Sequence, residues 1–148
     1  MIALLQRVTE AHVAIAGTTV ASIQQGLLVL LGIERDDQAS EVKKLAQRVA
    51  QYRLFSDADD KMNLSVTDIA GSVPVVSQFT LAADTNSGRR PSFSSAAAPA
   101  LAEPLYQQFV AELQQLGIYV ATGQFGADMQ VSLTNDGPVT FLLNSKGK

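Results

Sequence analysis

The chain has 148 residues, of which 47% are hydrophobic and 17% are charged, and this balance is typical of one globular domain spanning residues 1–148. Its net charge of −3 leaves no global basic field to attract nucleic acid, so any RNA contact must be local, and we expect no binding to DNA. Cys is absent, which excludes disulfides and thiolate chemistry. No apolar run approaches the roughly 18 residues that span a bilayer, and no signal-peptide pattern is present, so we expect a cytoplasmic protein without a membrane partner.

The first third of the chain predicts three strands and a helix. Residues 2–15 alternate imperfectly between apolar and polar, as in a half-buried strand, and residues 20–23 continue as a second strand. The continuous apolar run 27–33 suits a strand that is buried on both faces. A helix is then expected to open at Asp36-Asp37, where acidic residues favour the positive end of the helix dipole. Its apolar face comprises Val42, Leu45, Ala46, Val49 and Tyr52.

The rest of the chain predicts a strand at 73–79, a long ordered loop at 85–99 and a second helix that ends near Gly117. The apolar stripe of this helix comprises Leu101, Leu105, Phe109, Leu113 and Leu116. Closing strands are expected at 118–121, 129–133 and 139–143. The predicted fold class is α/β, a single domain with a mixed, largely antiparallel β-sheet or barrel and two amphipathic helices packed on it.

Familiar catalytic and metal-binding sets are missing from the sequence. His12 is the one His in the sequence. Because it lies in the first predicted strand, we interpret it as a polar residue on the outer face of that strand. A Ser-His-Asp triad would rest on this His alone, and a zinc site needs a cluster of His or Cys. No Gly-rich phosphate loop is present. We therefore expect no metal ion and no cofactor.

A strand end rich in hydroxyl and amide groups, Ser77-Gln78-Phe79-Thr80, is the first candidate site. In an extended strand, Ser77 and Phe79 point to one face, while Gln78 and Thr80 point to the other. Thr80 offers a nucleophilic hydroxyl, but no activating base lies near it in the sequence. The alternative is that the two hydroxyls only satisfy main-chain groups at the end of a strand.

Gly137-Pro138 is the second candidate element. Gly reaches backbone angles that are closed to other residues, and Pro lacks an N–H donor. An ordinary trans turn is one interpretation, since only about 5–6% of X-Pro bonds in folded proteins are cis. A cis bond would turn both carbonyls the same way and form a wall without side chains. Such a wall excludes a substituent on one side of a bound amino acid's α-carbon.

Six short motifs in chain order resemble those of the D-aminoacyl-tRNA deacylases over essentially the full length of the chain. Any one of them is weak, but six in order make a specific signal, and the two central motifs show no departure. They are Leu5-Gln6-Arg7-Val8, Lys61-Met62-Asn63-Leu64-Ser65-Val66, Ser77-Gln78-Phe79-Thr80-Leu81, Arg90-Pro91-Ser92-Phe93, Gly123-Gln124-Phe125-Gly126-Ala127-Asp128-Met129 and Asn135-Asp136-Gly137-Pro138-Val139-Thr140.

The resemblance implies a homodimer that hydrolyses the ester between a D-amino acid and the 3′-terminal adenosine of tRNA, a chiral proofreading step in translation. The implied partner is the 3′ end of aminoacyl-tRNA. Glycine has no side chain to exclude, so glycyl-tRNA is expected as a second substrate. The resemblance also implies that substrate is bound in a catalytic pocket, largely through main chain. In this chain the residues expected to line the catalytic pocket and bind the substrate are Ser77, Gln78, Phe79 and Thr80.

The same resemblance assigns chiral selection to the Gly-Pro element. It implies that Gly137-Pro138 is cis, reaches into the partner subunit's site and excludes L-side chains, while Arg7 holds it in orientation. Phe125 and Met129 are expected to form walls for the terminal adenine. No protein base is then needed, because the ribose 2′-hydroxyl assists water, and main-chain donors near the strand end stabilise the oxyanion.

Two other functions stay open from the residues alone. One is a Thr- or Ser-dependent hydrolase of small D-amino esters or amides that needs no tRNA, to which the acidic charge gives weight. The other is a non-catalytic, dimeric, β-rich binding module. The candidate phosphate contacts are Lys61, Arg89, Arg90, Lys146 and Lys148, although residues of this kind are more often simply solvated surface.

Overall fold

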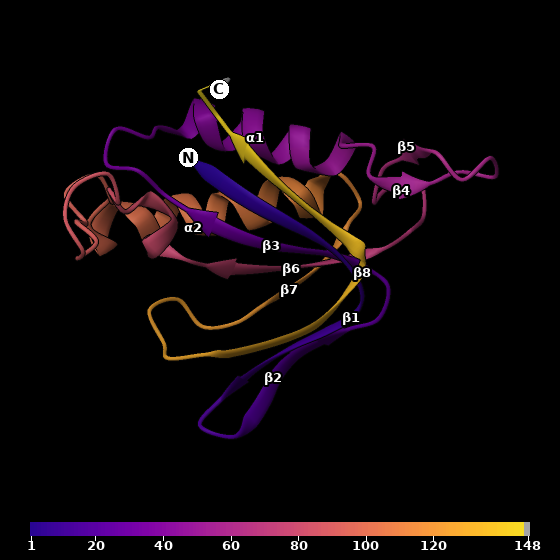
Figure 1. The fold of residues 1–148 in the computed structure, drawn as a ribbon, viewed down its shortest axis with the longest axis horizontal. Helices are drawn as coiled ribbons and strands as arrows, with labels where there is room; N and C mark the ends of the chain where they lie inside the picture. Colours follow the sequence, from indigo (N-terminus) through magenta and orange to yellow (C-terminus); the bar gives the residue numbers. More distant parts are fainter. Residues whose placement is uncertain (147–148) are drawn as a thin grey trace.

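The computed structural model describes residues 1–146 as a mixed α/β domain, in which a curved sheet carries two helices on one face (Figure 1). This confirms the predicted fold class. The elements are β1 (Ile2–Ile15), β2 (Thr18–Ile23), β3 (Gly26–Gly32), α1 (Ala39–Gln51), β4 (Phe55–Ser56), β5 (Met62–Leu64), β6 (Ser72–Ser77), the 3₁₀ turn η1 (Phe79–Ala82), α2 (Pro99–Gln115), β7 (Tyr119–Thr122) and β8 (Gln130–Asn144).

The long strand β1 is the centre of the sheet and is antiparallel to three neighbours. Its first half pairs with β3, from Ile2 opposite Gly32 to Val8 opposite Gly26, and its second half pairs with β2. The strand β8 runs along the other edge of β1 over both halves. Beyond β3 come β6 and β7 in parallel pairing. Because β2 also contacts β6 and β7, the sheet curls almost into a barrel.

The helices α1 and α2 lie beside each other over one face of the sheet, and they enclose the larger hydrophobic core (Figure 1). Leu5 from β1, Leu45 from α1 and Phe109 from α2 are fully buried in this core. The apolar spacing predicted for α1 is confirmed up to its last member, since Tyr52 lies just after the helix. Burial of these stripes gives most of the stability of short helices, whose own propensity is weak.

The predicted start of the first helix at Asp36-Asp37 is wrong, because α1 begins at Ala39. Asp37 has a different role and is only 3% exposed. Its carboxylate accepts hydrogen bonds from the Met1 α-ammonium at 2.8 Å and from the Glu34 N–H at 2.7 Å. A buried charge needs such partners. The helix begins instead at the capping box of Gln38 and Glu41, in which the Glu41 carboxylate accepts from the Gln38 N–H at 2.6 Å.

The second helix matches its prediction at the end and departs from it along the stripe. Gly117, with φ of 85°, follows α2 and stops it in the conformation that Gly tolerates best. Leu101 and Leu116 are exposed by 39% and 38%, so they do not belong to the buried face. Leu105, Phe109 and Leu113 are buried as predicted, and Ala102 and Tyr106 join them on the buried face.

Two of the predicted closing strands form a single strand, β8. Its ladder with β1 shifts register twice, and the larger shift is at the Gly-Pro motif, where Asn135 lies opposite Val8 and Thr140 lies opposite Gln6. Residues 136–139 therefore arch out of the ladder between two paired segments. The expected turn between strands is a bulge within one strand, and both of its ends are fixed by the sheet.

Candidate functional site

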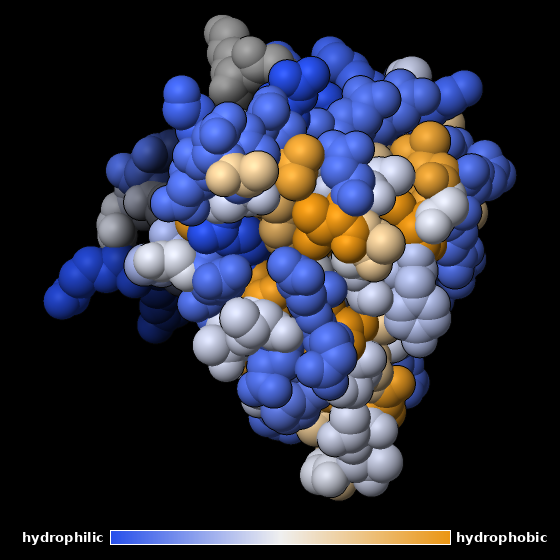
Figure 2. Space-filling view, turned by 90° about the vertical axis from the view of Figure 1, so that its right-hand side faces the viewer, coloured by the Kyte–Doolittle hydropathy of each residue, from blue (hydrophilic) through white to orange (hydrophobic). Residues whose placement is uncertain are grey.

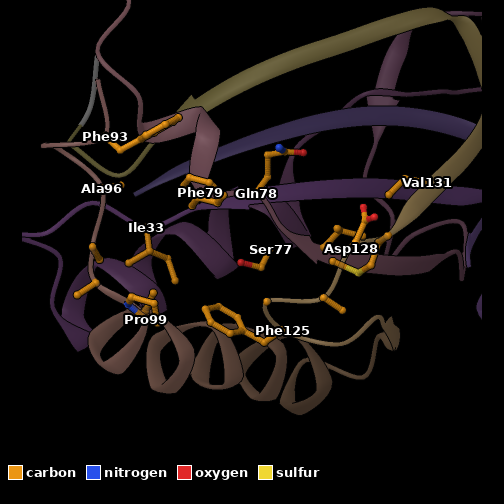
Figure 3. A pocket seen from close by; sticks show the side chains of 17 residues that line it. Ile33, Ser77, Gln78, Phe79, Phe93, Ala96, Pro99, Phe125, Asp128 and Val131 are labelled. Carbon is orange, nitrogen blue, oxygen red and sulfur yellow. The ribbon is translucent and has the colours of Figure 1, made fainter. Parts of the chain in front are cut away.

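A cavity of about 620 Å³ opens where the end of β6 meets two loops (Figure 3). One loop precedes α2 and is the predicted ordered loop, and the other joins β7 to β8. The first loop is fastened to the chain after β3. Ala97 donates its N–H to the Ile33 carbonyl at 2.9 Å, and Arg35 donates its N–H to the Ser95 carbonyl at 3.1 Å. A wall without regular secondary structure is thus held in a defined position.

The hydroxyl- and amide-rich motif lies at this cavity, but not as an extended strand. β6 ends at Ser77, and Gln78 donates its N–H to the Leu31 carbonyl at 2.8 Å before the chain turns into η1. The predicted alternation of faces is therefore wrong beyond the strand end. Ser77, Gln78 and Phe79 line the cavity, whereas the exposed Thr80 does not. The Gln78 side-chain amide donates to the Thr80 hydroxyl.

The opposite wall contains Phe125 and Met129, both from the loop that leads into β8 (Figure 3). The Phe125 ring packs against Tyr106 of α2, with ring centroids 5.7 Å apart. Tyr106 in turn donates its hydroxyl to the Val75 carbonyl at 2.7 Å, and burial raises the pKa of Tyr106 to about 12. Gly123 makes room for the thioether, because a Cβ there would lie 2.5 Å from Met129 Sδ.

The cavity offers hydroxyl, amide and main-chain groups rather than a strong base. Among its described lining residues, Asp128 is the one titratable side chain, and it is exposed. His12 lies on β1, exposed as predicted and outside the lining. The sequence pattern did not mark Asp128 or Phe93 as site residues, although each lies in one of the six family motifs. Both are in loops, where no periodicity marks a residue as lining a site.

The Gly137-Pro138 dipeptide lies on the bulge of β8, and both residues are exposed. Its peptide bond is cis, and Gly137 has φ of 144°, a region open to Gly and rare for other residues. Arg7 of β1 lies beside it. The Arg7 Nε donates to the Asp136 carbonyl at 2.8 Å, and its Nη1 donates to the Leu54 carbonyl at 2.8 Å. One guanidinium thus connects the bulge to the body of the domain.

Asn135 closes the other side of the bulge. Its Oδ1 accepts from the Val139 N–H at 2.6 Å, and its Nδ2 donates to the Val139 carbonyl at 3.2 Å and to the Thr140 hydroxyl at 3.0 Å. The bulge is therefore held at both ends by side chains of its own motif and of β1. A projection fixed in this way keeps its shape while its tip is in solvent.

The two motifs lie apart from each other along the sheet. In the ladders, Ala3 of β1 is level with Leu31, which pairs with Ser77 at the cavity. Arg7, beside the Gly-Pro bulge, is four residues farther along β1, and at about 3.3 Å per residue this is roughly 13 Å. Figure 1 shows η1 and the bend of β8 on different sides of the molecule. Gly137 and Pro138 do not line the cavity of their own chain.

Comparison with known proteins places this arrangement in a family. Residues 4–144 match the family model described as D-Tyr-tRNA(Tyr) deacylase. The chain belongs to the D-aminoacyl-tRNA deacylase family. A D-aminoacyl-tRNA deacylase from Proteus mirabilis (strain HI4320) is 60% identical, and one from Haemophilus influenzae (strain ATCC 51907 / DSM 11121 / KW20 / Rd) is 58% identical. Each match covers 97% of this chain and 99% of the relative. The family and the enzyme class predicted from the motifs are confirmed.

Solved structures support the fold of this deacylase-family chain. A structure described as c-Myc DNA Unwinding Element Binding Protein is 37% identical, with a TM-score of 0.92 over 97% of this chain and 98% of that chain. A probable eukaryotic D-amino acid tRNA deacylase has a TM-score of 0.84 over 96% and 97% of the two chains. At 15% identity, this second likeness concerns the fold alone.

The remaining predicted contacts of this deacylase-family chain are surface residues. Lys61, Arg89, Arg90 and Lys146 are exposed, and Lys148 lies outside the described residues. No helix within residues 1–146 has the length and apolar character needed to cross a membrane.

Proposed function

We propose that this chain hydrolyses the ester of D-aminoacyl-tRNA and releases a free D-amino acid and reusable tRNA. The observation that carries the proposal is the position of the Ser77-Gln78-Phe79 motif, which lines a cavity large enough for an aminoacyl-adenosine end. In this assignment Phe125 and Met129 hold the terminal adenine on the far wall. The aminoacyl ester then lies against the end of β6.

Chirality is selected by the Gly137-Pro138 bulge of a second copy of the chain. Within one chain this dipeptide is exposed and does not line the cavity. Arg7 and Asn135 hold the bulge as a fixed projection, which suits insertion into a neighbouring site. Main chain brought close to the substrate's α-carbon leaves space for hydrogen on one side only. An L-side chain is rejected there by contact with peptide groups, and a D-side chain points away.

The assembly that follows is a homodimer with two-fold symmetry, in which each copy gives its bulge and receives the other. Figure 2 shows the right-hand side of Figure 1, which is the side where β8 bends. Apolar areas are exposed across the middle of this side (Figure 2). The exposed apolar side chains of the described chain include Met62 of β5 and Leu142 of β8, at 50% and 62% exposure. Apolar areas exposed on one side of a molecule suit a subunit contact.

The chemistry uses the substrate's own reactivity. Water adds to the ester carbonyl, the bond to the ribose oxygen breaks, and that oxygen takes a proton as tRNA leaves. The neighbouring ribose 2′-hydroxyl positions or activates the water, because the cavity lacks a His or Lys. Phe79 and Thr80 begin η1, where helix geometry supplies no main-chain acceptor for the first N–H groups. Of these, the N–H of the cavity-lining Phe79 faces the developing oxyanion, and a donor of this kind is worth about 10²–10³ in rate.

Glycyl-tRNA is a second substrate in this account. Glycine carries hydrogen on both sides of its α-carbon, so the Gly137-Pro138 wall has nothing to reject. A wall that rejects an L-side chain by contact admits glycine together with D-amino acids. Aminoacyl-tRNAs that carry an L-amino acid with a side chain are rejected.

The decisive experiment compares D- and L-tyrosyl-tRNA in single-turnover assays. We expect release of D-tyrosine only, and equal cleavage of both would contradict the chiral filter. A mixing experiment tests the cross-subunit site. Ala98→Trp fills the cavity and Gly137→Ala damages the bulge, so each variant alone is inactive. Mixed dimers then have one intact site in two, and random mixing restores about a quarter of the wild-type activity.

The RNA-assisted chemistry has its own test, in which the terminal ribose 2′-hydroxyl of D-tyrosyl-tRNA is replaced by hydrogen. Turnover should be abolished while binding persists. Full activity on this substrate would show that the 2′-hydroxyl has no part in the mechanism, and it would favour Thr80 as a nucleophile.

Competing functions differ in what must be bound. A hydrolase of small D-amino esters would cleave a minimal ester as fast as D-aminoacyl-tRNA, and a binding module would bind tRNA without hydrolysis. One structural relative is described as a DNA unwinding element binding protein. The net charge of −3 gives no general attraction to duplex DNA, and we expect none.

A further inference from the structure

Two aromatic rings lie exposed at the mouth of the cavity. Phe79 begins η1 and Phe93 lies in the loop before α2, with ring centroids 5.1 Å apart and planes at 58°. Phe79 is 56% exposed and Phe93 is 43% exposed. A single exposed Phe needs no explanation, but a contacting pair at a cavity suggests a ligand.

The structure holds both rings in place. The Phe93 loop closes on itself through a two-way bridge, in which Asp84 and Ser92 exchange N–H and carbonyl hydrogen bonds of 2.7 and 2.9 Å. The Phe93 carbonyl accepts from the Ala96 N–H at 3.1 Å. Phe79 follows Gln78, which is anchored to β3. The pair is therefore a built surface and not the end of a loose loop.

The positions of the rings order them along one line. In Figure 3, Phe125 lies on one side of the cavity with Ser77 beside it, Phe79 lies on the other side, and Phe93 lies beyond Phe79. In the proposed function, the terminal adenosine lies between Phe125 and the end of β6. The RNA strand that leads to this adenosine must therefore leave the cavity. The Phe79–Phe93 pair lies at the mouth on the side away from Phe125.

The same loop carries local positive charge. Arg89 and Arg90 are exposed and precede Phe93 by four and three residues, and Asp84 is the one acid in residues 84–98. Two Arg and one Asp give +1 for this loop, against −3 for the whole chain. Aromatic rings next to Arg are the pattern with which proteins bind single-stranded nucleic acid.

We propose that Phe79 and Phe93 form a stacking subsite for the base of the nucleotide just before the terminal adenosine, with Arg89 and Arg90 near its phosphate. This rests on the proposed function, because it takes the cavity as the adenosine site. A stacked base is recognised by its face, so the subsite tolerates any base. It explains how a protein of acidic net charge binds an RNA end through a small contact.

The test uses Phe93→Leu, which removes the aromatic face and keeps an apolar side chain. Its substrates are D-tyrosyl-adenosine, the D-tyrosyl ester of the dinucleotide cytidylyl-adenosine, and the same dinucleotide without the cytosine base. We expect kcat/KM on the complete dinucleotide to fall about tenfold, the lower range for one stacked base. It should stay unchanged on the other two substrates. Phe93→Trp should retain the wild-type preference, and Tyr119→Leu, at an exposed aromatic residue of β7, is the matched control.

Three outcomes would overturn the subsite: equal loss on all substrates, no loss on any, or wild-type indifference to the cytosine base. A shift of Phe93→Leu toward the mass of a single chain in light scattering would also overturn it, by assigning the rings to a subunit contact. Binding of the unacylated trinucleotide CCA separates this inference from the proposed function. Phe93-dependent binding without any hydrolysis by the wild type would support the subsite and contradict the hydrolytic function.

Discussion

The cavity at the end of β6 and the bulge of β8 carry the two most recognisable motifs, yet they are built in opposite ways. The cavity is concave and is assembled from η1 and two loops. The bulge is convex, lies within one strand and is held by Arg7 and Asn135. Neither completes the other inside one chain. In the proposed dimer, the cavity of one copy would meet the bulge of the other, so the two surfaces would be joined only by assembly.

The largest expected effect is a loss of stability when the buried contact between Asp37 and the Met1 α-ammonium, near the cavity, is weakened. Asp37→Asn leaves the buried Met1 α-ammonium with less opposing charge, and it loosens the turn at Glu34 that lies next to Ala96 of the cavity loop. Breaking a buried ion pair costs about 3 kcal/mol or more. We expect that loss in urea denaturation, whereas the exposed Asp36→Asn should stay within about 0.5 kcal/mol of the wild type. Equal stability of both variants would show that the cluster is not structural.

The next largest effect should come from the bulge, where we expect Gly137→Ala to lower activity without changing the fold. A Cβ at this position would lie 2.5 Å from Val139 Cγ2 and 2.9 Å from the Val139 nitrogen. The bulge must shift, and displacement of a reacting geometry by about 1 Å can cost about 10²-fold in rate. We expect this loss on D-tyrosyl-tRNA with an unchanged circular dichroism spectrum. Gly17→Ala, in the turn between β1 and β2, is the control, since it also places Ala at a positive φ but its Cβ would meet nothing within 4 Å.

A smaller effect is expected from Tyr106→Phe behind the cavity wall. The change leaves the Val75 carbonyl without this donor and should cost about 1 kcal/mol of unfolding free energy. The pKa of Tyr106 is raised from 10.0 to about 12, so above pH 10 the unfolded state loses this proton first. Wild-type stability should therefore fall between pH 10 and about 12, and its advantage over the variant should shrink there. An advantage that is constant with pH would contradict the assignment.

The smallest expected effect is at Thr80. Its hydroxyl is exposed, bonded to the Gln78 amide and outside the cavity lining. Thr80→Ala should keep most of the deacylation rate in single-turnover assays. Removal of a true nucleophile costs about 10⁴-fold or more, so a loss of that size would make Thr80 catalytic and end the account based on main chain and RNA. Thr80→Ser distinguishes loss of the hydroxyl from loss of the methyl group.

Local patterns in the sequence predicted what local physics controls. Residues 2–15 alternate because one face of β1 is buried, and the buried run of β3 is apolar throughout. Gly117 ends α2 because a left-handed residue is needed there. The motifs at Ser77 and Gly137 were visible because each is a short, contiguous segment with unusual composition.

Only tertiary structure decided how these segments meet. The sequence did not indicate that Asp37 would be buried beneath the Met1 α-ammonium, because those residues are brought together by pairing of β1 with β3. It did not indicate that the chain turns into η1 after Ser77, or that residues 136–139 bulge from one continuous strand. Strand register and the packing of loops depend on contacts between residues far apart in the chain. The sequence by itself thus determined the long strands, the two helices and the family, and the fold placed the cavity and the Gly-Pro bulge on different sides of the molecule (Figure 1).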